Sequence, residues 1–165
     1  MLSKYGSVDK ILANDKLKLN LKLHTIVEGN EPICMVKTTS QTLSELSTAF
    51  SRLKPEIVVV IGDRYENLAV AIAASYMNIS LAHIQGGEVT GSIDETVRHA
   101  ITKLSHIHFV CTKRAKIFLI KMGEKKGTIY NTGCPSIDLV NKLDKKIDRN
   151  FSNKNRLKSV GDQIN

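Results

Sequence analysis

The sequence has no tryptophan, only three prolines and three cysteines, and aromatic residues make up 5% of its 165 residues. Cys34, Cys111 and Cys134 are an odd number without CxxC spacing, which argues against a disulfide framework and against a tetrahedral zinc site. No apolar run approaches the roughly 18 to 20 residues of a membrane span, and the N-terminus MLSKYGSVDK lacks the apolar stretch of a signal peptide. We therefore expect a soluble, cytoplasmic domain with reduced thiols and no membrane partner.

The formal net charge is +8, from 24 basic and 16 acidic residues. Much of the excess lies in a lysine-rich end, Lys142 to Arg156 above all. Because the chain has neither aromatic platforms nor a basic helix, we do not expect a nucleic-acid partner. An anionic small substrate is compatible with the charge.

Apolar and polar residues alternate between strand-like and helix-like periods along most of the chain. The β-branched run IVVVI, residues 57–61, predicts a parallel strand that is buried on both faces. Strand and helix in turn, with short connections, predict an α/β fold with a doubly wound, mostly parallel Rossmann-like sheet. Strands are expected at residues 20–27, 55–63, 80–85, 107–111 and 128–132, and helices within 1–14 and at 35–53, 66–77, 93–104, 114–122 and 136–143.

Three finer expectations complete this layout. Thr39 or Ser40 is the candidate N-cap of the helix at 35–53, and Ser136 that of the last helix. Residues 1–143 are expected to form the Rossmann-like domain. Residues 144–165 have few apolar side chains and no strong period, which predicts a linker or disordered tail.

The stretch Leu81–His99, LAHIQGGEVTGSIDETVRH, combines an apolar run, a glycine pair and a dense group of ionisable residues. The glycine pair breaks the strand where a side chain would crowd the backbone. In an open parallel sheet ligands bind beyond the carboxyl ends of the strands, where this loop would lie beside Asp63 from an earlier strand. Paired carboxylates with separated pKa values supply an acid and a base at one site. We therefore expect Asp63, Gln85 and Asp94 to converge on an active-site mouth.

Several of these ionisable residues also have structural explanations. Asp63 could cap the helix that follows it, and this role and catalysis are equally open. Asp94 and Glu95 suit the first turn of a helix, where acidic groups complement the dipole. His99 is favoured as a salt-bridge partner of Glu95 over a catalytic role.

Other local patterns favour structure over chemistry. Arg64 and Glu66 are expected to form a local ion pair. Cys134 has no companion histidine placed by the sequence, so a nucleophilic role is not expected. The chain has neither GxGxxG nor GxxxxGK[ST], which argues against an ordinary dinucleotide fingerprint and against a Walker-type ATPase.

Taken together, the run IGDRYENLAVAIAASYMNISLAHIQGGEVTGSIDETVRHAITKLSHIHFVCT, followed by NTGCPSID, resembles the hydrolysing UDP-N-acetylglucosamine 2-epimerases of sialic-acid biosynthesis. The likeness is ordered along the chain from Tyr5 to Val140. The combination of GDR, HIxGGEVTG, IDExxRHAITKLSH and GCPS is far more specific than any one motif.

The resemblance implies one half of a glycosyltransferase B-type fold, in which the sugar nucleotide lies between two Rossmann-like domains. It implies elimination of UDP from UDP-GlcNAc and then addition of water, which releases N-acetylmannosamine and UDP. No metal or redox cofactor is implied, because carboxylates move the protons. The full-length family tends to form homo-oligomers. This chain would begin after the family's first strand and would lack its second domain.

The family's three catalytic carboxylates fall at Asp63, at position 85 and at Asp94. Position 85 holds Gln85 where the family pattern HIEGGE has glutamate, and an amide cannot transfer a proton as a carboxylate does. The resemblance therefore implies a weak or inactive chain. The candidate substrate-binding residues within the matched motifs are Arg64, Gly86, Gly87, Glu88 and Arg98.

Two other interpretations are compatible with the sequence. The chain could be a non-catalytic sugar-nucleotide-binding or remnant module, which Gln85 favours. It could also be an unrelated flavodoxin-like domain, in which Asp63 and Asp94 would lie on opposite faces. The choice between UDP-GlcNAc and a diacetamido UDP-sugar is left open by the residues present.

Overall fold

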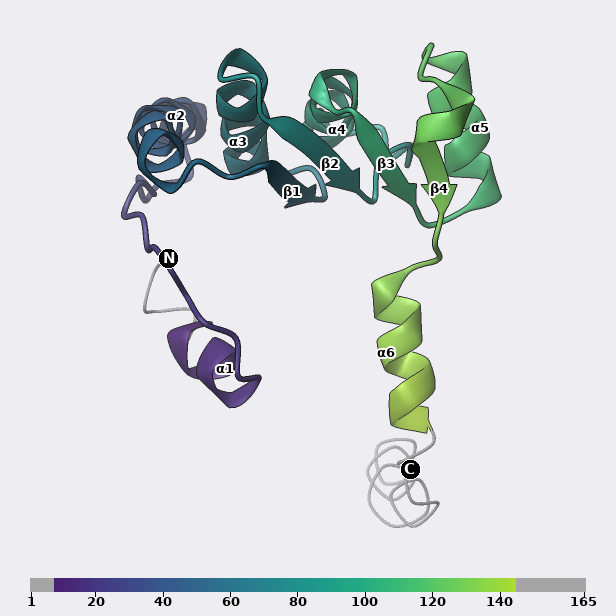
Figure 1. Cartoon of the computed structure of the whole chain (residues 1–165), viewed down its shortest axis with the longest axis horizontal. Coiled ribbons are helices and arrows are strands. Elements are labelled where there is room, and N and C mark those ends of the chain that lie inside the picture. Colours follow the sequence, from purple (N-terminus) through teal and green to yellow (C-terminus); the bar gives the residue numbers. More distant parts are fainter. Residues whose placement is uncertain (1–7, 145–165) are drawn as a thin grey trace, which may run out of the picture. The chain divides into compact units, whose positions relative to one another are not determined.

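The structure, a computed structural model, describes residues 8–144 (Figure 1). The chain divides after Thr132 into two compact units. The first contains a four-stranded sheet with helices α1 to α5, and the second contains α6 (Pro135–Asp144). The predicted tail, residues 144–165, lies outside the described residues apart from Asp144.

The sheet is entirely parallel, and its spatial order β1-β2-β3-β4 is the order of the sequence. One row of the register runs from Ile61 through Ile84 and Phe109 to Tyr130, close to the carboxyl ends of the strands. This architecture confirms the predicted parallel Rossmann-like α/β sheet. The strands are β1 (Ile57–Ile61), β2 (Ser80–Ile84), β3 (Ile107–Val110) and β4 (Ile129–Asn131).

Three helices pack on one face of this sheet. They are α3 (Tyr65–Tyr76), α4 (Ile93–Leu104) and α5 (Lys113–Lys121), and Figure 1 shows them side by side in a row that runs across the sheet. Each crossover leads to the next strand in the same direction, and right-handed crossovers of one direction place their helices on one face. A short 3₁₀ turn, η2 (Lys126–Thr128), leads from α5 into β4.

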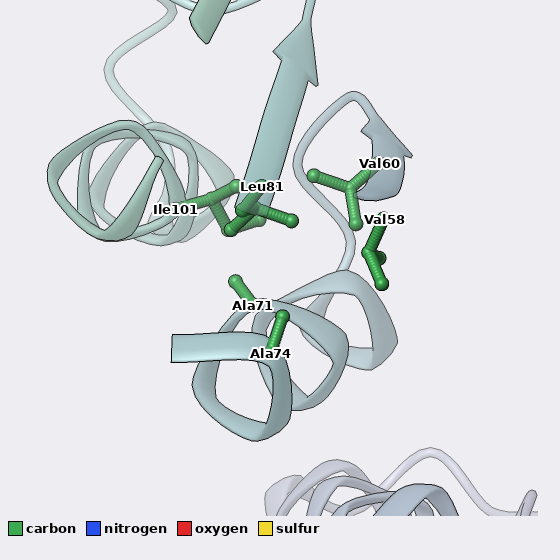
Figure 2. Packing of buried hydrophobic residues seen from close by; sticks show 6 residues of the cluster. All are labelled: Val58, Val60, Ala71, Ala74, Leu81 and Ile101. Carbon is green, nitrogen blue, oxygen red and sulfur yellow. The ribbon is translucent and has the colours of Figure 1, made fainter. Parts of the chain in front are cut away.

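The main core lies between this helix layer and the strands. Small residues of α3 let the helix approach the sheet closely, as Figure 2 shows for Ala71 and Ala74. The valines of β1 that face the helices are buried. The cluster comprises Val58, Val60, Ala71, Ala74, Leu81 and Ile101.

The opposite face of β1 is not buried, so the prediction of burial on both faces is wrong for this part of the chain. Ile57, Val59 and Ile61 are 47%, 53% and 58% exposed, and they alternate with the buried valines. The described crossovers all run one way and supply helices to one face only. The β-branched run therefore forms a strand that helices cover on one face only.

The segment at residues 20–27 is not a strand, which corrects the prediction from its alternating leucines. A strand needs a neighbouring ladder for its backbone groups. This segment instead forms hydrogen bonds with threonine side chains of α2 (Pro32–Leu53). The Val27 amide donates to Thr38 Oγ1 at 2.9 Å, and Thr42 Oγ1 donates to Thr25 Oγ1 at 2.7 Å.

Two predicted caps are also wrong. Helix α2 begins at Pro32 with Glu31 as its N-cap, so Thr39 and Ser40 lie inside the helix. Helix α6 likewise begins at Pro135, which places Ser136 in the first turn. In both cases proline opens the helix, because its missing N–H has no partner in a first turn in any case.

The remaining helix boundaries agree with the sequence to within a residue or two, and α4 coincides with its predicted range. Helix α1 (Val8–Asn14) confirms the short helix expected near the N-terminus. None of the helices in the described part of the chain is long and apolar enough to cross a membrane.

Candidate functional site

Asp63 follows the carboxyl end of β1 and does not cap the next helix. The N-cap of α3 is Arg64, and no side-chain hydrogen bond caps that end. Gly62 has a positive φ of 78°, which turns the chain sharply out of the strand. Asn67 of α3 secures this turn, because its side-chain amide donates to the Ile61 carbonyl at 2.6 Å. The cap interpretation of Asp63 is therefore wrong.

The carboxylate of Asp63 instead forms an ion pair with Arg98 of α4. The side chain of Arg98 is 7% exposed and that of Asp63 is 27% exposed. A second guanidinium nitrogen of Arg98 donates to the Glu88 carbonyl. Arg98 thus joins the loop after β1 to the loop after β2, and removing it would leave a half-buried carboxylate without its partner.

His83 of β2 contacts the peptide that precedes Asp63 and was not among the residues singled out from the sequence. It is fully buried. Its Nε2 is 2.9 Å from the Gly62 carbonyl, and its Nδ1 is 3.1 Å from Thr102 Oγ1 on α4. The signal that could have revealed it is a titratable side chain inside an apolar strand, three residues before Gly86.

The two glycines after β2 are required for different reasons. A Cβ at Gly86 would lie 3.0 Å from both His83 Nδ1 and Thr102 Oγ1, so the missing side chain makes room for that hydrogen bond. Gly87 has a φ of 84° and packs against α5. A Cβ there would lie 2.8 Å from the Ala115 carbonyl.

Gln85 leaves β2 at the same edge of the sheet as Asp63. Ile61 and Ile84 are register partners, and the Gly62 amide donates to the Ile84 carbonyl at 3.0 Å. Gln85 has a φ of 68°, a conformation that non-glycine residues seldom adopt and that is found preferentially at functional sites.

The two acidic residues at the start of α4 differ in their surroundings. Glu95 accepts hydrogen bonds from the amides of Thr90 and Gly91, both at 2.6 Å, and these bonds lower the pKa of its carboxyl. Asp94 is exposed in the same turn. Glu95 therefore binds the loop before α4 to the first turn of that helix, much as the glutamate of a capping box binds the amide of the N-cap residue.

Asp94 and Arg98 are four residues apart on α4, so their side chains project from the same side of the helix. Because Arg98 contacts Asp63, this side of α4 faces the carboxyl edge of the sheet. Asp63, Gln85 and Asp94 thus stand on neighbouring segments. Their convergence on one substrate remains a prediction.

Two local pairs agree with the structural roles expected from the sequence. Arg64 Nε is 3.1 Å from Glu66 Oε2. His99 Nε2 is 3.5 Å from Glu95 Oε1, one turn earlier on α4. Within residues 11–141 no group of three or more histidine, cysteine, aspartate or glutamate side chains is placed to hold a metal ion.

His83 predicts a pH dependence of stability. Burial lowers its pKa from 6.5 to about 4, helped by His108 and Arg98 and opposed by the Gly62 carbonyl and Asp63. Between these two values the unfolded chain binds a proton at this site that the folded chain does not. The free energy of unfolding therefore falls as pH falls, by roughly 3 kcal/mol from this group.

Urea unfolding at about pH 7 and about pH 4.5 would measure this loss. Since other groups titrate in the same range, the informative quantity is the difference between the wild type and His83→Gln. The variant should lose less stability on acidification than the wild type. Equal losses would show that His83 is not held neutral by its burial.

The family model described as "UDP-N-acetylglucosamine 2-epimerase" matches residues 7–164 of this chain. A UDP-N,N'-diacetylbacillosamine 2-epimerase (hydrolyzing) of Legionella pneumophila is 48% identical over 104 residues, which are 63% of this chain and 28% of that protein. A GDP/UDP-N,N'-diacetylbacillosamine 2-epimerase (hydrolyzing) of Campylobacter jejuni is 37% identical over 146 residues, 88% of this chain and 36% of that protein.

A crystal structure of a Neisseria meningitidis UDP-GlcNAc 2-epimerase bound to UDP-GlcNAc has a similar fold, with a TM-score of 0.74 and 26% identity. The likeness covers 88% of this chain and 40% of that one. The chain thus spans about a third of the length of its curated relatives. With a family match over nearly its whole length, the chain belongs to the UDP-N-acetylglucosamine 2-epimerase family.

Proposed function

We propose that this chain provides part of the active site of a hydrolysing 2-epimerase that converts UDP-GlcNAc to N-acetylmannosamine and UDP. The observation that carries the proposal is the ion pair of Asp63 with Arg98, which lies one turn beyond Asp94 on α4. Gln85 follows β2, the strand paired with β1, and all of these residues fall within the range that the family model matches. A cytoplasmic, homo-oligomeric enzyme without a cofactor is part of the same proposal.

The proposed reaction has two steps. Removal of the proton at C2 of the sugar and cleavage of the bond between C1 and the diphosphate oxygen give 2-acetamidoglucal and UDP. Water then adds across the double bond. The hydroxyl joins C1, and a proton joins C2 on the face opposite to the one from which the first proton was removed. Each step needs a proton acceptor or donor beside the sugar, which is the role proposed for the carboxylates of Asp63 and Asp94.

Arg98 prepares Asp63 for such a role. The ion pair with the guanidinium keeps the carboxylate in one position beside the loop after β2. The ion pair of Asp63 with Arg98 also lies beside the candidate binding residues. These follow β1, at Arg64, and β2, at Gly86, Gly87 and Glu88.

A diacetamido UDP-sugar is the alternative substrate within the same reaction class. The Legionella pneumophila and Campylobacter jejuni relatives are named for N,N'-diacetylbacillosamine nucleotides. A second candidate function is a sugar-nucleotide-binding module without catalysis. Gln85 favours it, because the amide can hydrogen-bond a sugar but cannot supply a proton as an acid does.

Titration calorimetry of the chain with UDP-GlcNAc, UDP and UDP-N,N'-diacetylbacillosamine, together with an assay of released sugar, tests these functions. Saturable binding and sugar release support the hydrolysing epimerase, and the tighter ligand identifies the sugar. Binding without release supports the module. The proposal fails if none of the three nucleotides binds to the folded chain.

A further inference from the structure

We propose that His83 is a positioning residue: as a neutral imidazole protonated at Nε2, it holds the Gly62 carbonyl and so fixes the direction in which Asp63 leaves β1. This inference rests on the proposed function, in which Asp63 acts on the sugar. His83 itself is buried and does not face the open edge of the sheet.

The contacts of His83 determine its tautomer. A carbonyl oxygen can only accept, so the 2.9 Å contact to Gly62 requires a proton on Nε2. In a neutral ring Nδ1 is then an acceptor, and the hydroxyl of Thr102 donates to it across 3.1 Å. Burial favours the neutral ring, since it lowers the pKa of His83 to about 4.

The helix α4 controls Asp63 by two routes. Thr102 acts through His83 on the peptide between Gly62 and Asp63, and Arg98, one turn earlier, acts on the Asp63 carboxylate directly. Both the backbone and the side chain of Asp63 are thus held from the same helix. A catalytic carboxylate must keep its position to within a fraction of an ångström, which such double support provides.

The sequence around β2 fits this role. Gly86 has no side chain at the one place where a Cβ would press on both His83 and Thr102. The charged or titratable groups around the ring are Arg98 from α4, Asp63 after β1 and His108, its register partner on β3. Burial also lowers the pKa of His108, and Glu124, whose carboxylate is 3.3 Å from His108 Nε2, opposes that shift.

The full chain can be tested with two variants of His83. In His83→Gln the side-chain amide can reach the position of Nε2 and donate to Gly62, whereas His83→Leu keeps the volume and loses the donor. Long-range proton–nitrogen NMR of the wild type should show the Nε2-protonated neutral ring from about pH 8 to about pH 5. The backbone amide signals of Gly62 and Asp63 should shift in His83→Leu and return close to the wild-type positions in His83→Gln.

A ring protonated at Nδ1, or Gly62 and Asp63 signals that do not change in His83→Leu, would overturn the positioning role. The wild-type tautomer decides the question even if His83→Leu does not fold. Titration of the same samples with UDP-GlcNAc tests the function separately. We expect roughly three- to tenfold weaker binding in His83→Leu and wild-type binding in His83→Gln. Equal affinities would overturn the role, whereas a wild type that binds no UDP-GlcNAc would refute the proposed function and leave the tautomer result standing.

Discussion

Replacing Gln85 by glutamate is expected to raise the rate of sugar release from UDP-GlcNAc by about 10²- to 10⁴-fold, the usual contribution of one acid or base group. Glutamate has the shape of glutamine and adds a group that can exchange a proton. Neither residue is glycine, so both have the same difficulty in adopting the φ of 68° at this position. The comparison therefore isolates the proton-transfer chemistry.

The measurement should use this chain and also a chimera in which it replaces the matching part of the Neisseria meningitidis enzyme, because the chain spans only 40% of that relative. Gln85→Met is the matched control, since it keeps the length of the side chain without an ionisable group and should stay at the wild-type rate. A chimera in which wild type and Gln85→Glu release sugar equally fast would show that position 85 is not an acid or base site.

Gly87→Ala is expected to lower the free energy of unfolding by roughly 2 to 5 kcal/mol. About 1 to 2 kcal/mol of this is the cost of a left-handed backbone for alanine, and about 1 to 3 kcal/mol more comes from steric overlap. The new Cβ would lie 2.8 Å from the Ala115 carbonyl and would also press on the side chain of Leu119. The carbonyl is part of the α5 backbone and cannot move without shifting the helix.

Gly123→Ala separates the two contributions. Gly123 also has a positive φ, of 93°, but no atom lies within 4 Å of a Cβ built there. Its loss should be roughly 1 to 2 kcal/mol, from the backbone alone. Urea unfolding followed by circular dichroism gives both values. If Gly87→Ala lowered the free energy of unfolding no more than Gly123→Ala, close packing of the loop after β2 against α5 would not be the reason for glycine at position 87.

The ranges of most helices and strands followed from local pattern. Helix α4 was located from its apolar face and coincides with its prediction, because that face packs against the neighbouring elements α3 and β2. The segment at residues 20–27 alternates apolar and polar residues as a strand does but is not one, because alternation does not supply the neighbouring strand that its backbone groups would need. The two helices that begin with proline start earlier than their predicted ranges for a different reason: proline at the first position outweighs the serine and threonine caps on which the predictions depend.

In the candidate site, too, some features followed from the sequence and others only from the structure. The family motif identified Asp63, position 85, Asp94 and Arg98 from the order of residue types along the chain. It did not reveal that Arg98 holds Asp63, or that Glu95 closes its own loop while Asp94 stays exposed. His83 was missed altogether, because a histidine in an apolar strand has the same appearance in a sequence whether or not it has partners.

The sequence by itself determined the fold class, the family and the residues at the carboxyl ends of the strands, since these depend on local periodicity and on motif order. Only the tertiary structure decided which side chains are partners. Asp63, His83, Arg98 and Thr102 come from three different elements, and their contacts arise from the register of β1 with β2 and the packing of α4 on β2. Neither of these is encoded within any single stretch of the chain.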